Sequence, residues 1–393
     1  MSLYGFVLGT NHSLCKVEIC AVLQSRNIDF KIIASSEEIL IIEANEVPKI
    51  NEFGSTAKLV KFYKDLNEII LEVPSTTKNI TYGVSVYNGG GRFKQLNQLW
   101  YDAPTIAREM RDIMREYRIK GGFLQLKDRI LSTVSVNENL LKTGGFELVL
   151  ASGADKTYIG KTLEVQHYEE YSERDYGRPE RDDEAGMVPP KIAKMMVNLA
   201  QLPKEAKILD PFCGSGTYLM EELLLGYKNI VGSDLDIKAV ERSKKNLEWQ
   251  FGDLKINIRS IDALRLGQFY KDIDAIITEP FLGSTKLRVM RRDQVLKERE
   301  FLEKFYLDVF AQYKKVLKQG GKIVMILPVI RYKSEFYYLD IIDKIQKLGF
   351  SRLPYCENQK ELGLNLTERG TIVYYRPKQT VSREIFVWQL LKN

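Results

Sequence analysis

Acidic residues follow three successive apolar stretches of this sequence, and the first of them opens a turn of small residues. The acids are Asp210, Asp234 and Asp262. The turn that begins at the first acid continues with Pro211, Phe212, Cys213, Gly214, Ser215 and Gly216. Because parallel strands end at a common edge of their sheet, we expect the three carboxylates to lie around a shared ligand site at that edge.

The glycine turn indicates a ligand that approaches the backbone closely. Glycine has no Cβ to block such an approach, and a helix that follows the turn would offer partial positive charge at its N-terminus. The turn is neither the dinucleotide fingerprint G-x-G-x-x-G nor a P-loop. An acid ahead of the glycines suits a cationic or hydrogen-bond-donating head group better than it suits a pyrophosphate.

Three strand-end acids around one glycine turn are typical of an S-adenosylmethionine pocket. In such a pocket one acid serves the amino-acid end, one the ribose hydroxyls and one the adenine amine. The predicted cofactor-binding residues are Asp210 and the turn after it, with Pro190, Asp234, Leu235, Asp262, Ala263 and Glu279. An ordinary α/β turn with incidental acids is the alternative. Cys213 could also act as a nucleophile, but we favour a small residue in a tight turn, because no base is encoded nearby.

A fourth apolar stretch ends in residues that suit a methyl acceptor. They are Glu279, Pro280, Phe281 and Leu282, and we predict that they form the catalytic strand end. An exocyclic amine on a purine is a weak nucleophile, and a carboxylate that accepts its N–H hydrogens favours its attack. Glu279 supplies the carboxylate, Pro280 stiffens the loop and Phe281 supplies a ring for stacking. The alternative is a proline turn that ends a buried strand.

Strands that alternate with long helices must position these residues. The pattern predicts strands over 206–209, 229–233, 256–261, 274–278, 322–327 and 371–375, with helices over 191–199, 298–317 and 338–348. Pro190 suits the first turn of the first of these helices, where a missing N–H costs nothing. The alternation predicts an α/β, Rossmann-like, doubly wound and mostly parallel sheet over 190–393.

The N-terminal part alternates shorter elements. Residues 1–70 predict an α+β domain, with strands over 4–9, 30–33 and 39–42 and a helix over 14–24 that Ser13 caps. Residues 71–165 predict a second α+β domain, with a strand over 80–87, a flexible loop over 88–94 and a helix over 103–117. A charged linker, 166–189, follows, and its aromatic residues and paired charges favour an ordered segment.

Basic residues gather on the loop and helix of the second domain and on the linker. The predicted RNA contacts are Arg92, Lys94, Arg108, Arg111, Arg115, Arg174, Arg178 and Arg181. A basic helix beside a strand surface fits contact with a phosphate backbone. A solvated charged face is the alternative, because Asp and Glu are interspersed.

Composition narrows the class of protein. The chain has 393 residues, enough for two or three domains, and a modest net charge of +6, so RNA binding would need a local basic face. The four cysteines form no C-x-x-C pair and only two histidines occur, which argues against a metal site or a disulfide framework. No signal peptide opens the chain and no apolar run reaches bilayer length, so we expect a cytoplasmic protein without a membrane partner.

With these motifs in hand, the chain resembles the THUMP-domain tRNA guanine-N2-methyltransferases, nearest the archaeal guanine-10 type. The most specific similarity runs through Arg174-Asp175-Tyr176-Gly177-Arg178-Pro179, Arg181-Asp182, Gly186-Met187, Pro189-Pro190-Lys191 and 196–200, and 210–216 matches the family's cofactor loop. The resemblance implies a ferredoxin-like start, a THUMP region that grips tRNA, S-adenosylmethionine as cofactor, and methylation of a guanosine N2 amine.

The catalytic motif departs from the family pattern Asp-Pro-Pro-Tyr. Without a gap, Glu279 stands for the Asp and Leu282 for the Tyr; a shift by one restores the Pro-aromatic pair at Pro280 and Phe281 but moves the acid. The sequence leaves both registers open. It also leaves open adenine N6 or rRNA as the target, a catalytically impaired THUMP protein that only binds RNA, a small activator protein as partner, and the oligomeric state.

Overall fold

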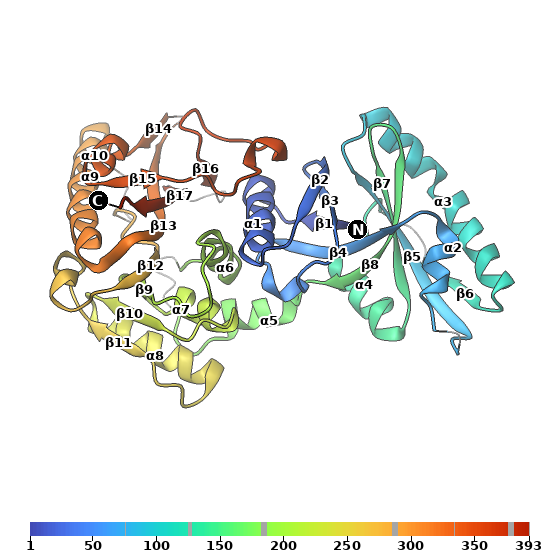
Figure 1. The fold of residues 1–393 in the computed structure, drawn as a ribbon, viewed down its shortest axis with the longest axis horizontal. Helices are drawn as coiled ribbons and strands as arrows, with labels where there is room; N and C mark the ends of the chain where they lie inside the picture. Colours follow the sequence, from blue (N-terminus) through green and yellow to red (C-terminus); the bar gives the residue numbers. More distant parts are fainter. Residues whose placement is uncertain are drawn as a thin grey trace. The chain divides into compact units, whose positions relative to one another are not determined.

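The computed structural model describes residues 1–74, 76–124, 128–181, 187–284, 290–333, 335–375 and 381–392. Its contacts divide the chain into two compact units. The first comprises Met1–Tyr168 with Lys360–Leu364, and the second comprises Glu169–Gln359 with Asn365–Asn393 (Figure 1). Residues 182–186 of the expected linker, which include Asp182 and Gly186 of the family-like motif, lie outside the described residues.

The first unit is built on a continuous sheet in the order β2-β3-β1-β4-β8-β7-β5-β6. Its strands are β1 (Ser2–Leu8), β2 (Phe30–Ser35), β3 (Ile39–Ala44), β4 (Thr56–Tyr63), β5 (Asn79–Asn88), β6 (Lys120–Phe123), β7 (Phe146–Ser152) and β8 (Thr157–Val165). β4 pairs antiparallel with β8, so the sheet crosses the domain boundary that the sequence suggested near residue 70.

The helices of the first unit are α1 (His12–Ser25), α2 (Leu66–Leu71), α3 (Phe93–Glu116) and α4 (Thr133–Asn139). The N-cap of α1 is Asn11 rather than the predicted Ser13, because the Asn11 side chain accepts a hydrogen bond from the backbone N–H of Leu14. α3 begins inside the stretch expected to be a flexible loop. Buried Leu96 and Leu99 extend its apolar face toward the N-terminus, so packing overrides the glycines that precede it.

The second unit contains the doubly wound sheet that the sequence predicts, and this sheet is parallel in one half and antiparallel in the other. The strand order is β11-β10-β9-β12-β13-β17-β15, with β14 beside β13 and β16 beside β17. The strands are β9 (Ile208–Asp210), β10 (Ile230–Asp234), β11 (Asn257–Ser260), β12 (Ile273–Thr278), β13 (Leu317–Tyr332), β14 (Glu335–Tyr338), β15 (Phe350–Arg352), β16 (Ile372–Tyr374) and β17 (Val381–Leu390). The strands β9 to β13 run parallel to one another, whereas β14 and β17 both run antiparallel to β13.

The helices of the second unit include two groups of contacting neighbours (Figure 1). They are α5 (Tyr168–Ser172), a π-helical turn (Glu173–Gly177), α6 (Pro190–Leu199), α7 (Thr217–Leu224), α8 (Ile237–Phe251), α9 (Arg292–Val316) and α10 (Ile342–Lys347). α7 contacts both α6 and α8, while α9 contacts α10. α10 is shorter than the predicted helix, because 335–338 pairs with β13 as β14. Among the described residues, no helix is both long and apolar enough to cross a membrane.

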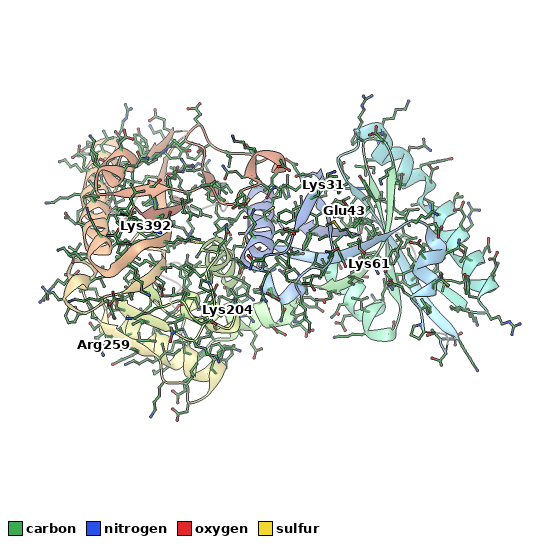
Figure 2. All side chains as sticks on the ribbon, in the orientation of Figure 1. Lys31, Glu43, Lys61, Lys204, Arg259 and Lys392 are labelled. Carbon is green, nitrogen blue, oxygen red and sulfur yellow. The ribbon has the colours of Figure 1, made fainter. Side chains whose placement is uncertain are left out.

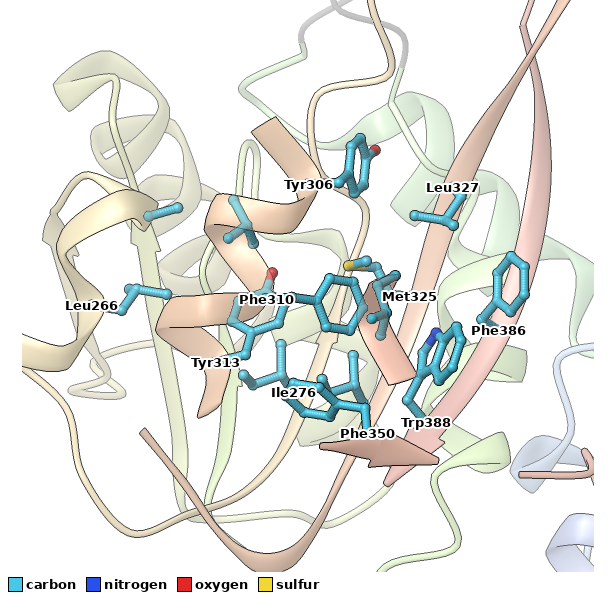
Figure 3. Packing of buried hydrophobic residues seen from close by; sticks show 14 of the residues in the cluster. Leu266, Ile276, Tyr306, Phe310, Tyr313, Met325, Leu327, Phe350, Phe386 and Trp388 are labelled. Carbon is cyan, nitrogen blue, oxygen red and sulfur yellow. The ribbon is translucent and has the colours of Figure 1, made fainter. Parts of the chain in front are cut away.

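Aromatic side chains hold the middle of the second sheet in place (Figure 3). Phe310 of α9 lies edge-on to Trp388 of β17, with ring centroids 6.1 Å apart, and Trp388 stacks on Phe386 at 5.5 Å. Ile276 of β12 and Met325 of β13 are buried in the same cluster. Since interiors of this kind are close-packed, the cluster fixes the strands whose ends carry the candidate site.

Candidate functional site

The predicted acids meet at the carboxyl edge of the second sheet. Asp210 ends β9, Asp234 ends β10, and Glu279 directly follows β12. Asp262 follows β11 and is the N-cap of a 3-10 turn over Ala263–Gln268. β9 lies between β10 and β12, where the strand order reverses direction, and ligands of such sheets bind at this switch point.

Asp210 is a fully buried carboxylate with one oxygen engaged and the other unused. Its Oδ1 accepts hydrogen bonds from the Thr278 hydroxyl at 2.6 Å and the Phe212 backbone N–H at 3.2 Å. Its Oδ2 is buried and has no hydrogen-bond partner in the described part of the chain. Burial raises the pKa of Asp210 to about 7, and the charges of Asp234 and Glu279 add to this rise, although the Thr278 hydrogen bond opposes it.

The glycine turn joins β9 to α7 in backbone conformations that glycine favours. Gly214 has a φ of +51° and donates its N–H to Asp234 Oδ2 at 2.9 Å. Gly216, the N-cap of α7, has a φ of +84°, and a Cβ built there would lie 2.5 Å from Ser243 Oγ. Cys213 is buried, and burial raises the pKa of its thiol well above the usual value, which favours the small-residue interpretation over a nucleophile.

The other predicted cofactor residues lie along the same unit. Asp234 is partly buried, and burial raises its pKa, although backbone hydrogen bonds from Asp236 and Gly214 oppose the rise. Leu235, directly after it, is 71% exposed, so apolar surface lies beside this carboxylate. Asp262 Oδ1 accepts a hydrogen bond from the Leu264 backbone at 2.9 Å. Two further members are buried, Ala263 in the 3-10 turn and Pro190 at the first position of α6.

Glu279 forms a bidentate ion pair with Arg383 of β17. Arg383 Nε lies 2.7 Å from Glu279 Oε2, and Arg383 Nη2 lies 2.9 Å from Glu279 Oε1. The two side chains are 4% and 8% exposed. Burial disfavours the charged guanidinium, but Glu279 outweighs this effect, so the pKa of Arg383 is raised. The two hydrogen bonds of the pair fix the Glu279 carboxylate in one orientation.

Sequence reasoning missed Arg383, because it left the role of the tail after residue 377 open. The signal was a pair of charged residues, Arg383 and Glu384, directly before the apolar run 385–388. In the structure this run is the core of β17, and both charged residues are buried. Buried charges at the start of a buried strand call for partners, and that requirement could have marked the segment as part of the site.

The remaining residues of the predicted catalytic strand end differ in exposure. Pro280 is buried, Leu282 is partly buried and Phe281 is 49% exposed. The Phe281 carbonyl accepts a hydrogen bond from the Tyr306 hydroxyl at 3.1 Å. This contact anchors the loop to α9, while the aromatic ring of Phe281 stays accessible to solvent.

Two of the predicted RNA contacts are internal instead. Arg174 is 4% exposed, and its Nε donates to Glu221 Oε1 at 2.7 Å. Arg178 is 3% exposed and donates from Nη1 to Ser215 Oγ at 3.3 Å and Thr217 Oγ1 at 2.8 Å. Burial of both guanidinium groups contradicts the predicted contact with an RNA backbone. Arg181 is exposed.

The basic residues predicted on the first unit lie on α3. Arg92 is its N-cap, Lys94, Arg108 and Arg115 are exposed, and Arg111 is partly buried. Near the end of α3 a pocket of about 440 Å³ is lined by Arg111, Arg115, Arg118, Ile119, Lys120 and Gly121. Four of these six residues are basic, so the pocket suits an anion. Contact with RNA stays a prediction.

Comparison with known proteins places a methyltransferase family model, described as the RMKL-like methyltransferase domain, on residues 178–345. A tRNA (guanine(10)-N2)-dimethyltransferase of Methanothermobacter thermautotrophicus is 34% identical over 158 residues, which cover 40% of each chain. The protein of that name from Methanocaldococcus jannaschii is 28% identical over 215 residues, covering 52% of this chain and 58% of its own. The chain spans about half the length of the curated relatives it matches.

Among solved structures, TrmN from Thermus thermophilus matches 99% of this chain and 100% of its own, with a TM-score of 0.54 and 15% sequence identity. At that identity the match shows the fold. The second unit therefore has the Rossmann-like methyltransferase fold that the strand and helix pattern predicts.

Proposed function

We propose that this chain is an S-adenosylmethionine-dependent methyltransferase that acts on the exocyclic N2 amine of a guanosine in tRNA. The observation that carries the proposal is the carboxyl edge of the second sheet, where the glycine turn, Asp210 and the Arg383-bound Glu279 follow neighbouring strands β9 and β12. The matched relatives named tRNA (guanine(10)-N2)-dimethyltransferase favour guanosine 10 as the target.

The residues at this edge fit S-adenosylmethionine. The unused Asp210 Oδ2 is a buried acceptor suited to a cationic amino group. Gly214 leaves the space beside the backbone open, because a Cβ built there would come no closer than 4.0 Å to another atom, the Phe212 carbonyl oxygen. Asp234 is an acid at the end of the second strand, the position that binds ribose hydroxyls in doubly wound sheets. When bound, the cofactor supplies an electrophilic methyl group.

The chain's own residues would position the acceptor base. Glu279, fixed by Arg383, accepts a hydrogen bond from the N2 amine and so increases electron density on its nitrogen. The exposed ring of Phe281 stacks on the guanine, an interaction worth about 1–3 kcal/mol. Most of the rate would come from holding two substrates in line, because little acid–base strength is needed.

For the first unit we propose tRNA binding through the basic face of α3 and the pocket at its end. We also propose that the expected THUMP region comprises residues 71–165 and that the protein acts in the cytoplasm. A phosphate backbone would be attracted by the exposed arginines without base-specific contacts. The target base would then be chosen at the carboxyl edge of the second sheet.

Methyl transfer to unmodified tRNA transcripts tests the proposal. With methyl-labelled S-adenosylmethionine, nucleoside analysis should show N2-methylated guanosine. N6-methyladenosine would instead support the adenine alternative, and transfer to rRNA alone would exclude tRNA as the substrate. Absence of transfer with both cofactor and tRNA bound would support an RNA-binding protein without catalysis.

A further inference from the structure

Arg178 is a buried arginine that uses only part of its hydrogen-bonding capacity. Its side chain is 3% exposed, and within the described residues only Nη1 donates, to the hydroxyls of Ser215 and Thr217. Nε and Nη2 are buried and lack a hydrogen-bond partner among the residues that the structure describes. A buried charged donor left unmatched is costly, so the site is incomplete without a further acceptor.

The unmatched guanidinium lies at the N-terminus of a helix. Ser215 and Thr217 flank Gly216, the N-cap of the eight-residue helix α7. Free backbone N–H groups and the helix dipole favour a negative group there. Asp175 and Glu221 are the nearby acids, but within the described ranges neither forms an ion pair with Arg178. Helix and arginine therefore both favour an anion from outside the chain.

An unmatched acceptor lies at the other end of the same turn. Asp210 opens the turn at the end of β9, and its buried Oδ2 has no donor among the described residues. The turn 210–217 thus carries an unused carboxylate oxygen at its start and an unused guanidinium edge at its end. A ligand that matches both must present a cation and an anion on one small group, as the head of a free α-amino acid does.

We propose that Arg178 binds the carboxylate of the amino-acid end of S-adenosylmethionine, while Asp210 Oδ2 accepts a hydrogen bond from its ammonium group. The inference rests on the proposed cofactor and replaces the expected RNA contact of Arg178. The two substituents of the α-carbon would each meet the opposite charge in a water-poor site, where such hydrogen bonds are strong. Arg178 would thus select amino-acid-bearing adenosine compounds over those without a carboxylate.

Calorimetric binding of two ligands to the full chain tests this assignment. The ligands are S-adenosylmethionine and its decarboxylated form, which keeps the sulfonium and an ammonium but lacks the carboxylate. The wild type should bind S-adenosylmethionine roughly 10- to 100-fold more tightly, the value of one charge-assisted contact. Arg178→Gln should bind both ligands with affinities within about 3-fold of each other. Equal affinities in the wild type, or undiminished preference in Arg178→Gln, would overturn the assignment.

Arg174→Gln is the matched control. It removes a second buried arginine from the same segment, but that arginine pairs with Glu221 rather than facing the glycine turn. It should lower stability and keep the wild-type preference for the carboxylate; loss of the preference here would point to a general effect of unfolding. Should Arg178→Gln fail to fold, equal affinities of the wild type for the two ligands would still overturn the assignment. Failure of the wild type to bind either ligand, or S-adenosylhomocysteine, would instead reject the proposed cofactor itself.

Discussion

At the scale of single residues, burial gives the site its chemical character. Asp210 is buried beside two other acids, and burial raises its pKa to about 7. An unpaired buried carboxylate is costly, and a protein keeps one where a ligand will match it. The sequence identified Asp210 correctly as a strand-end acid, but it could not show that one oxygen would be satisfied by Thr278 and the other left over.

The raised pKa of Asp210 predicts a pH-dependent free energy of unfolding. In the folded chain the carboxyl binds its proton up to about pH 7, whereas in the unfolded chain it ionises near its ordinary value of 3.8. The stabilising effect of the protonated form is therefore complete below about pH 4 and is lost as pH rises through 7, by up to about 1.4 kcal/mol per pH unit. Urea denaturation at a series of pH values from 5 to 8 measures this change in the free energy of unfolding.

Asp210→Asn is the reference for this measurement, because its amide does not titrate. The wild type should lose stability relative to Asp210→Asn as pH rises. A difference between the two that stays constant from pH 5 to pH 8 would mean that Asp210 is ionised throughout.

At the scale of elements, the start of α7 depends on the absence of a side chain at Gly216. Gly216→Ala should destabilise the protein for two reasons, the left-handed φ and the 2.5 Å approach to Ser243 Oγ. Gly226→Ala, at the other end of α7, introduces a similar φ of +89° with no atom within 4 Å of the new Cβ. We expect about 1–2 kcal/mol for Gly226→Ala and about 1–3 kcal/mol more for Gly216→Ala.

Chemical denaturation measures the loss in free energy of unfolding that each of the two substitutions causes. Equal losses of stability would show that the packing against Ser243 relaxes freely. Cofactor affinity should fall with Gly216→Ala and stay unchanged with Gly226→Ala, since only the first lies in the turn.

The ion pair between Glu279, directly after β12, and Arg383 of β17 predicts a separation of binding from catalysis. Arg383→Lys keeps the positive charge but loses the planar fork that fixes the carboxylate. We expect kcat to fall by about 10-fold or more, because a misplaced acceptor orients the amine poorly. The Kd for S-adenosylmethionine should change by less than about 3-fold.

Arg369→Lys provides the control, because Arg369 pairs with Glu384 on the same strand but away from Glu279. It should leave kcat within about 2-fold of the wild type. An unchanged kcat in Arg383→Lys would show that Glu279 needs no fixed orientation.

The sequence predicted elements well where apolar runs ended in a distinct signal. β9, β10 and β12 were found because each run stops at an acid, and α6 because Pro190 marks its first turn. β17 was missed, since its antiparallel partner β13 lies far away in the sequence and no local pattern encodes that pairing. Tertiary packing decided the features that the sequence did not predict. α3 begins earlier than expected because Leu96 and Leu99 are buried. The Arg178 side chain points inward and donates to the Thr217 hydroxyl of α7.

At the scale of the whole molecule, the candidate functions are divided between two units. The second carries the candidate cofactor and catalytic residues, and the first carries the basic face of α3. Net charge alone did not locate this face, because +6 is small for a chain of 393 residues. A positive potential that attracts RNA comes instead from a local cluster of basic residues, Arg111, Arg115, Arg118 and Lys120.

Charge reversal on this face should change how tRNA affinity depends on salt. Each lost phosphate contact lowers the slope of log K against log salt concentration by about 0.7–0.9, so reversal of the exposed Arg115 and Arg118 should lower it by roughly 1.4–1.8. Lys31→Glu, an exposed site on β2, is the control (Figure 2). An unchanged slope in the double variant would place the RNA on another surface.

The central claim, that the carboxyl edge of the second sheet methylates a guanosine N2 amine, is tested most directly with a substituted tRNA. In this transcript inosine replaces guanosine 10, the position named for the matched relatives. Inosine keeps the ring of guanosine and lacks its exocyclic amine. The account predicts methyl transfer to the unsubstituted transcript and none to the inosine transcript, with both bound equally well. Equal transfer to both would contradict it, because the methyl group would then go to another atom.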